Sequence, residues 1–184
     1  MSERVLVDAE ALTALTEQLA EQIASAGEEP LVIVGIREGG DVLARRLEAG
    51  LRSRDIAIDG IGALDITLYR DDFGHRQHWP EIRDSDIPVD LTRKNVLLVD
   101  DVLFTGRTIR AALAALLDYG RPATVRLAVL IDRGNRQLPI QPDYCGQVID
   151  LDRDELCLVR FVEQGHPRDE VIAVARPDTE LTGA

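Results

Sequence analysis

The chain has 184 residues, enough for one domain with a sizeable hydrophobic core, and we predict a single domain over residues 1–184. Its 33 acidic and 21 basic residues give a formal net charge of −12, which argues against a general nucleic-acid-binding protein and against DNA as a partner. Without a signal sequence, a membrane-spanning run or a cysteine motif for metal, we expect a cytoplasmic protein with reduced thiols and no membrane contact.

The first third of the chain predicts two helices around a buried strand. Leucine and isoleucine recur at helical spacing between residues 12 and 23, and Gly27 stands where that helix would end. Residues 31–36 form an unbroken apolar run, which is typical of a parallel strand buried on both faces. This run leads into a turn at residues 37–40 (R-E-G-G) and then into a second helix that we expect to stop at Gly50.

The second quarter predicts strands followed by an irregular segment. Apolar and polar side chains alternate at residues 56–58 and again at 64–68, as they do in strands. From about residue 69 to residue 92 the pattern breaks into charged residues, glycine, proline and a tryptophan. We expect a mobile hairpin or lid there, since enzymes use such lids to exclude water from a reactive intermediate.

The centre of the chain combines a buried strand with polar groups that suit a phosphorylated sugar. Residues 96–99 predict a parallel strand, Asp100 and Asp101 follow it, and residues 105–108 lead into a helix over 109–118. Free N–H groups at a helix N-terminus attract a phosphate, and the two carboxylates could accept hydrogen bonds from sugar hydroxyls, directly or around Mg²⁺. The stretch has neither the Walker A nor the Rossmann sequence. The plainer interpretation is a buried strand with solvated acids at its end.

The last third predicts further strands. Residues 127–131 are apolar and read as a strand, which a polar loop follows up to residue 144. Two more strand-like segments lie at 155–163 and 170–175. Because strand–loop–helix units recur, we predict an open α/β sheet whose loops gather beyond the carboxyl ends of the strands.

The central block carries a family resemblance. Residues 96–108 (V-L-L-V-D-D-V-L-F-T-G-R-T) resemble the signature of the type I phosphoribosyltransferases, which bind phosphoribosyl pyrophosphate (PRPP). With L-D-I-T-L-Y-R-D-D at 64–72, D-I-P-V-D at 86–90 and the segment 127–144, nearly the whole chain is similar to the PyrR-type proteins. Those proteins are pyrimidine-operon attenuators that also have uracil phosphoribosyltransferase activity.

The resemblance implies a fold and a set of partners. The fold would be the type I phosphoribosyltransferase fold: a central, mostly parallel sheet flanked by helices, with a lid hairpin over roughly 69–92 and a small C-terminal hood over roughly 145–180. The cofactor would be Mg²⁺, and the chain would form a homodimer or a higher homo-oligomer. Its ligands would be PRPP, uracil, UMP or UTP, and pyrophosphate, together with the leader mRNA of its own operon.

The resemblance also implies roles for single residues. The PRPP-binding block would be Val96, Leu97, Leu98, Val99, Asp100, Asp101, Val102, Leu103, Phe104, Thr105, Gly106, Arg107 and Thr108. The catalytic residues would be Asp100, Asp101 and Arg70, with Mg²⁺ held mainly by PRPP near the two aspartates. The pyrophosphate loop would be Arg37, Glu38, Gly39 and Gly40, and the lid would include Tyr69, Asp71 and Asp72. Base-binding residues would be Tyr144, Cys145, Arg153, Asp154 and Glu155, and RNA-binding residues would be Arg133 and Arg136.

Four departures from the family pattern affect these expectations. Glu38 and Gly39 stand where relatives carry Thr-Arg, so one cation is missing from the pyrophosphate loop. Phe104 replaces a tyrosine and Asn135 replaces a histidine. Residues 147–155 are acidic where relatives are basic, which weakens the case for RNA binding because phosphate contacts supply much of such affinity.

Two alternatives to a uracil phosphoribosyltransferase stay open. Residues 142–146 (P-D-Y-C-G) also resemble the base pocket of the purine phosphoribosyltransferases, where Tyr144 could stack on a base. That branch usually has an aspartate at the position of Phe104, and a phenylalanine ring cannot exchange a proton, so we favour a pyrimidine acceptor. The other alternative is a nucleotide-sensing RNA-binding regulator with little catalysis.

Overall fold

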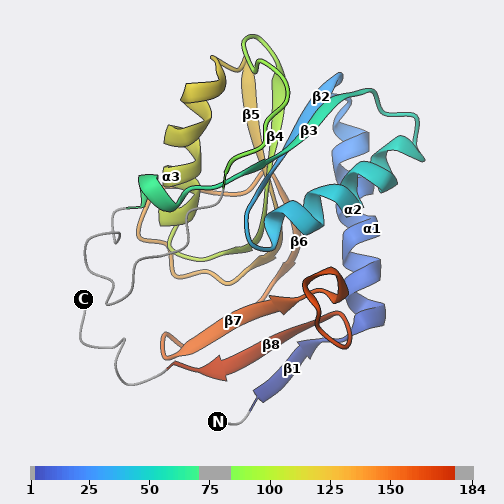
Figure 1. Cartoon of the computed structure of the whole chain (residues 1–184). Helices are drawn as coiled ribbons and strands as arrows, with labels where there is room; N and C mark the ends of the chain where they lie inside the picture. Colours follow the sequence, from blue (N-terminus) through green and yellow to red (C-terminus); the bar gives the residue numbers. More distant parts are fainter. Residues whose placement is uncertain (1–2, 71–83, 177–184) are drawn as a thin grey trace.

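The computed structural model of the protein describes residues 3–70 and 84–176. A five-stranded parallel sheet forms its centre (Figure 1). The strand order is β3-β2-β4-β5-β6, and every pair of neighbours is parallel. The strands are β2 (Leu31–Ile36), β3 (Ile58–Leu64), β4 (Asn95–Leu103), β5 (Thr124–Asp132) and β6 (Tyr144–Val148). This arrangement confirms the predicted α/β fold with a parallel central sheet.

Helices cover both faces of this sheet. Two helices, α1 (Ala9–Ala26) and α2 (Gly40–Arg52), pack on one face, and α3 (Arg107–Leu116) packs on the other. Because both faces are covered, β2 is buried along its whole length, as its continuous apolar sequence predicts. Short 3₁₀ turns lie at η1 (Thr67–Tyr69), η3 (Leu117–Tyr119) and η4 (Val162–Gln164). In the part of the chain that the structure describes, no helix is long and apolar enough to cross a membrane.

The two helices on the first face begin and end for different reasons. The helix α1 starts after Asp8, whose carboxylate accepts a hydrogen bond from the N–H of Ala11 at 2.9 Å, and it ends at Gly27 in the left-handed conformation. The helix α2 continues past Gly50 to Arg52, so the prediction that it stops at Gly50 is wrong. A Cβ atom on Gly50 would lie 3.2 Å from the Cβ of Ala20. This glycine therefore permits a close approach of α1 and α2 and does not end the helix.

A three-stranded antiparallel sheet lies below the main sheet in Figure 1, in the order β1-β8-β7. Its strands are β1 (Glu3–Val7), β7 (Glu155–Arg160) and β8 (Glu170–Ala175). We call this sheet the hood. It differs from the predicted hood at residues 145–180 in two ways: residues 3–7 belong to it, and residues 144–148 belong to the parallel sheet instead.

Two segments near the site differ from their predictions. The strand β4 extends through the acid pair to Leu103, because its backbone stays in register with β5 as far as Asp132. The predicted strand at 64–68 is wrong beyond Leu64. There the carboxylate of Asp65 accepts a hydrogen bond from the N–H of Thr67 at 2.7 Å, which turns the chain into η1. The predicted lid residues Asp71 and Asp72 lie outside the described residues.

Candidate active site

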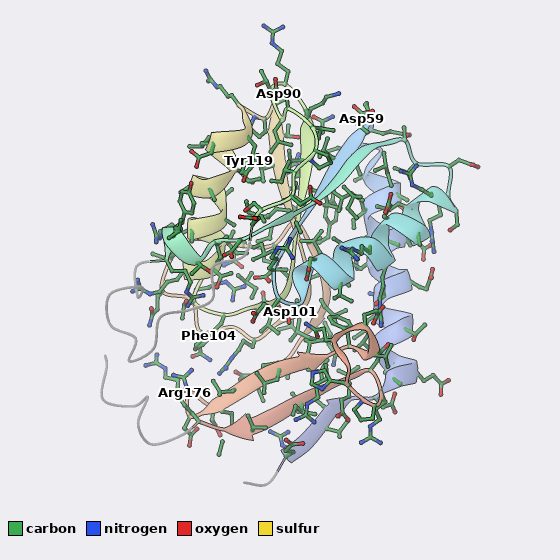
Figure 2. All side chains as sticks on the ribbon, in the orientation of Figure 1. Asp59, Asp90, Asp101, Phe104, Tyr119 and Arg176 are labelled. Carbon is green, nitrogen blue, oxygen red and sulfur yellow. The ribbon has the colours of Figure 1, made fainter. Side chains whose placement is uncertain are left out.

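The candidate site lies where the carboxyl ends of β2 and β4 meet. In an open parallel sheet the loops after neighbouring strands share one edge, and ligands bind there. The register pairs Gly35 of β2 with Val99 of β4, so the turn after β2 lies beside the acid pair of β4. Figure 2 shows Asp101 at this edge, between the main sheet and the hood. The structure therefore brings together two of the predicted parts, the pyrophosphate loop and the acid pair.

Two glycines let the β2–α2 turn lie directly against the acids. A Cβ atom on Gly39 would lie 2.5 Å from Oδ2 of Asp101, and one on Gly40 would lie 2.4 Å from the carbonyl oxygen of Val99. Gly39 also has a φ of +145°, a value that L side chains rarely adopt. The peptide between Arg37 and Glu38 is cis. No larger residue fits at 39 or 40 without moving the acid pair or the strand.

Burial sets the charge of the acid pair. Asp100 is only 5% exposed, and burial together with the neighbouring Asp101 raises its pKa well above the usual value. The charge of Arg70 acts in the opposite direction on the pKa of Asp100. Burial also raises the pKa of Asp101 to about 6, and the nearby Asp41 adds to this shift. Such a pair favours the approach of a cationic or hydrogen-bond-donating group, which would stabilise its ionised form.

Asp41, which the sequence analysis did not predict as a site residue, accepts hydrogen bonds at the start of α2. Its Oδ1 accepts hydrogen bonds from the N–H groups of Gly39 at 3.2 Å and Val42 at 3.1 Å. An aspartate in the first turn of a helix is a common N-terminal signal, so the sequence held this information. Its consequence is that one backbone donor of the turn is already occupied by the protein.

Contacts of η1 with α3 and η3 hold the segment that leads to Arg70. The hydroxyl of Tyr69 donates to Asp118, and Nη2 of Arg110 donates to the carbonyl oxygen of Tyr69 at 3.1 Å. Arg70 follows directly, and its charge acts on the pKa of Asp100. The charge of the predicted catalytic arginine thus acts on the acid pair, although the two are thirty residues apart in sequence.

The loop after β4 has the features of an anion-binding turn. Gly106 has a φ of +90°, and α3 begins directly after it without a hydrogen bond from a capping side chain. The carbonyl oxygen of Thr105 accepts hydrogen bonds from the N–H groups of Gln137 at 3.0 Å and Leu138 at 3.1 Å. The β5–β6 loop therefore supports this turn from behind. The N–H of Arg107 donates to Oγ1 of Thr105 at 3.3 Å, and the next amides of α3, at Thr108 and Ile109, lie at the open end of the helix where a phosphate would bind.

The prediction that Arg133 and Arg136 face RNA is corrected by the structure. Arg133 is 2% exposed and donates to backbone carbonyl groups. Arg136 forms an ion pair with Asp132 at 2.5 Å and also donates to the carbonyl oxygens of Phe104 and Ile140. Both guanidinium groups are used inside the protein, because the loop that carries them folds back onto the ends of β4 and β5. Neither is available to phosphates.

The predicted base-binding residues fall into two groups. Tyr144 pairs with Ala128, four residues before the end of β5, and packs with the core on the α1 face, where burial raises its pKa. Cys145 follows it on β6, and burial raises its pKa as well. Arg153, Asp154 and Glu155 instead lie at the loop that leads into β7, next to the carboxyl edge. The register of the sheet pairs Cys145 with Val129 and Val129 with Asp100, so Cys145 is level with the acid pair, two strands away.

One cluster at this edge was not predicted. The guanidinium carbon of Arg133 lies 4.0 Å from the ring centroid of Phe104, and that of Arg176 lies 5.9 Å from it. Figure 2 shows Phe104 and Arg176 facing each other between the main sheet and the hood. The contact between Phe104 and Arg133 joins the end of β4 to the residue after β5, and a sequence pattern carries no signal for it.

The donor set at this edge suits Mg²⁺ that is held mainly by another ligand. Carboxylate oxygens are the ligands that Mg²⁺ prefers, and Asp100 and Asp101 supply them. Among residues 3–70 and 84–176, no group of three or more histidine, cysteine, aspartate or glutamate side chains could hold a metal ion alone. The ion would therefore need oxygens from a bound phosphate compound, with the two aspartates beside it.

Comparisons with known proteins agree with this geometry. Residues 5–155 match the model of the phosphoribosyl transferase domain. The chain is 46% identical over 178 residues to "Bifunctional protein PyrR" of Roseiflexus sp. (strain RS-1), covering 95% of this chain and 96% of that protein. It is 48% identical over 163 residues to the protein of the same name from Geobacter sulfurreducens, covering 88% and 90%.

Solved structures support the fold. A hypoxanthine phosphoribosyltransferase of Trypanosoma cruzi superposes with a TM-score of 0.72 at 18% identity, covering 96% of both chains. A hypoxanthine phosphoribosyltransferase of Staphylococcus aureus superposes with a TM-score of 0.67 at 22% identity, covering 96% of this chain and 94% of that one. At such identities the likeness concerns the fold alone.

Proposed function

We propose that this chain, which belongs to the phosphoribosyl transferase domain family and within it to the PyrR proteins, transfers the phosphoribosyl group of PRPP to uracil. The products would be UMP and pyrophosphate. The observation that carries the proposal is the direct contact between the glycine turn after β2 and the acid pair of β4, of which Asp100 is buried and Asp101 is half-buried. A pyrophosphate bound at the turn would therefore lie beside sugar hydroxyls bound at the acid pair, as they are joined in PRPP.

Each part of the site then has one task. Asp100 and Asp101 accept hydrogen bonds from the ribose hydroxyls, and the turn at residues 105–108 binds the 5′-phosphate through the amides of α3. The turn at residues 37–40 binds the leaving pyrophosphate through its backbone and the Arg37 side chain. Bound Mg²⁺ would neutralise part of the pyrophosphate charge. Because the bond at the anomeric carbon breaks through an oxocarbenium-like state, positioning and electrostatics supply most of the catalysis.

The surroundings of Phe104 favour a pyrimidine acceptor over a purine. A purine needs a group that handles the proton of its imidazole ring, and a phenylalanine ring cannot do so. One face of this ring is also covered by the guanidinium of Arg133 at 4.0 Å.

The test is a comparison of acceptors. Purified protein with Mg²⁺ and PRPP should convert radiolabelled uracil to UMP, and it should convert hypoxanthine, guanine and orotate at least about tenfold more slowly, because a site built for one set of hydrogen bonds rejects the others. Turnover of guanine or hypoxanthine without turnover of uracil would overturn the assignment in favour of a purine enzyme.

We propose a regulatory role beside catalysis, in which UMP promotes binding to the leader mRNA of a pyrimidine operon. The support is membership of the PyrR family, and a homodimer or higher homo-oligomer would gather cations from several subunits on one face. Within the described residues, Arg93 and Arg121 are exposed neighbours: the N–H of Arg93 donates to the carbonyl oxygen of Arg121 at 2.9 Å, and neither side chain forms an ion pair. These two arginines replace Arg133 and Arg136 as RNA-contact candidates.

Binding to the leader RNA, with and without UMP and across a salt series, tests this role. Each lost phosphate contact should weaken binding and reduce the salt slope by about one. An Arg93→Ala/Arg121→Ala variant should therefore bind more weakly with a flatter salt dependence, while Arg136→Ala should act only through stability. Equal affinity for the leader and for an unrelated hairpin would contradict the regulatory role, and the transferase activity would then be the protein's only proposed function. Sedimentation of the same sample gives the oligomeric state.

A further inference from the structure

We propose that Arg133 is a positioning residue. It fixes the loop between β6 and β7, residues 149–154, in the orientation that binds the acceptor base next to the acid pair. The inference rests on the proposed transferase function and adds to it the group that orders one wall of the base site. Arg133 follows the last residue of β5, and its N–H donates to the carbonyl oxygen of Leu103 at 3.0 Å. Its backbone is therefore fixed to the end of β4.

The side chain of Arg133 reaches from the main sheet to the hood. Its Nη1 donates to the carbonyl oxygen of Glu155 at 2.8 Å, and its Nη2 donates to the carbonyl oxygen of Asp152 at 3.0 Å. Both acceptors lie at the loop that leads into β7. A planar guanidinium is the side-chain group that holds two such carbonyls at once with fixed geometry. The contact spans the space between the two sheets.

The face of the same guanidinium packs on the ring of Phe104, within residues 96–108. Its carbon lies 4.0 Å from the ring centroid of Phe104, within the range of a cation–π contact. Phe104 lies four residues after Asp100, so the contact ties the loop to the strand that carries the acids. A shift of Arg133 would therefore change the distance between the acid pair and the hood loop.

Arg133 holds the exposed end of this loop. Residues 152–154 are exposed, and Leu151 is the loop residue that is fully buried. Other contacts hold its two ends: the N–H of Ile149 donates to the carbonyl oxygen of Asp132 at 2.8 Å, Nδ2 of Asn135 donates to that of Leu151 at 3.3 Å, and the N–H of Arg176 donates to that of Asp154 at 2.6 Å. Arg133 supplies two side-chain bonds, to Asp152 and Glu155, which enclose the exposed residues.

Arg133 is also a buried cation without a carboxylate partner. In the described part of the chain, none of the ion pairs includes it, although it is 2% exposed. Burying a charge against neutral carbonyls is unfavourable compared with an apolar side chain of the same size. A residue that is needed only for packing would not require this charge, whereas holding two carbonyls in a fixed orientation does.

The chain offers a matched control. Arg46 also stacks on a phenylalanine, with its guanidinium carbon 4.7 Å from the ring centroid of Phe161, and it ties α2 to the hood through Glu163 and Asp169. Like Arg133 it stacks on a phenylalanine and joins the main sheet layer to the hood, but its partners are carboxylates and it lies at the far end of the hood, away from the acid pair. Arg46→Met and Arg133→Met remove the same groups from two different places.

Two measurements test the role of Arg133. In steady-state kinetics, Arg133→Met should raise the KM for uracil by about tenfold or more and leave the KM for PRPP within about twofold, since the lost bonds order only the base side. Arg133→Lys should lie in between, because a lysine reaches one carbonyl and not both. Arg46→Met should lower the melting temperature and leave both KM values unchanged.

Amide hydrogen exchange gives a readout that does not depend on activity. Arg133→Met should exchange faster at residues 149–155 and at an unchanged rate in β2. Unchanged exchange at 149–155 would overturn the inference, as would a uracil KM that stays at the wild-type value while exchange rises. An equal rise of both KM values would overturn it too, because it would indicate general loosening. If the wild type does not use uracil, the proposed function fails, and exchange alone decides whether Arg133 holds the loop.

Discussion

The pKa values of carboxylates shift in opposite directions at the carboxyl edge of the parallel sheet and at the outer end of the hood. At the edge, burial raises the pKa of Asp100 and Asp101, and the buried Arg133 forms no ion pair with any residue that the structure describes. In the hood, arginines bind carboxylates whose pKa is lowered by the contact, as for Glu163 and Asp169 beside Arg46. The hood is arranged for stability, whereas the edge keeps charges in unfavourable surroundings, as functional sites do.

The largest effect is expected from Asp101→Asn, which separates the two properties of the edge. Asparagine keeps an oxygen for the N–H of Val102, which donates to Asp101 at 2.8 Å, but it loses the negative charge. We expect activity to fall by about a hundredfold or more, since charge at the reacting sugar is the main contribution there.

The same variant should be more stable above pH 6. The pKa of Asp101 is about 6 in the folded protein and about 3.9 when unfolded, so the folded state binds more protons between these values and loses stability as pH rises. Removing the group should raise the free energy of unfolding by about 2 kcal/mol at pH 7.5 and have little effect at pH 4. Denaturant titrations at both pH values check this. Equal stability of both proteins at pH 7.5 would contradict a buried, unfavourable acid.

Gly39→Ala should sharpen the comparison at the edge, with Gly27→Ala as its control. Both glycines have a positive φ, so both variants should lose about 1 kcal/mol of stability through backbone strain. A Cβ on Gly39 would also lie 2.5 Å from Oδ2 of Asp101, whereas nothing lies within 4 Å of one on Gly27. We expect Gly39→Ala alone to lose activity, by about a hundredfold, because a displacement of about 1 Å at the reacting centre has that effect. Equal kcat/KM values in the two variants would mean that the turn does not contact the site.

In the hood, Arg46→Met should affect stability and leave activity unchanged. It breaks ion pairs of 2.6 Å to Glu163 and 2.7 Å to Asp169, and we expect a loss of about 2 kcal/mol at pH 7 for these partly buried pairs. The pKa of each carboxylate is lowered by Arg46, so this contribution is present at neutral pH and disappears as the pH falls through the lowered values. Thermal unfolding at pH 7 and below pH 3 measures the difference. A stability loss that persists below pH 3 would point to packing instead.

The smallest effect is expected at the contact that holds η1. Tyr69→Phe removes the hydroxyl that donates to Asp118, both of them near the surface, and leaves the bond from Arg110 to the Tyr69 carbonyl in place. We expect a stability loss of about 0.5 kcal/mol and a decrease of kcat of about twofold to threefold, because Arg70 is held less firmly. An unchanged kcat would show that the position of Arg70 does not depend on this contact.

The sequence was most informative where one local pattern decides the structure. The apolar run of β2 and the end of α1 at Gly27 lie where the local pattern puts them. The acid pair lies near the carboxyl end of β4, although that strand extends through it to Leu103. Prediction failed where distant residues decide. Gly50 reads as a helix stop but serves the contact with Ala20, and β1 pairs with a strand at the other end of the chain.

The arginines show the same limit at the site. Arg133 and Arg136 lie in a polar loop and read as surface cations, yet the loop folds back and buries them against carbonyl groups. No local pattern specifies such a contact, because the acceptors are backbone atoms of any residue type. In the same way, no local pattern shows that Tyr144 packs with the core on the α1 face, and its place in the base site stays a prediction.

The most direct test of the central claim is UMP formation from radiolabelled uracil, PRPP and Mg²⁺ by the wild type and by an Asp100→Asn/Asp101→Asn double variant. Thermal unfolding at pH 7.5 in the same buffer provides the control for folding. The account predicts that the wild type forms UMP, and that the double variant is at least as stable but forms UMP at least about a hundredfold more slowly. UMP formation by the double variant at the wild-type rate would contradict the account, and so would a wild type that forms none.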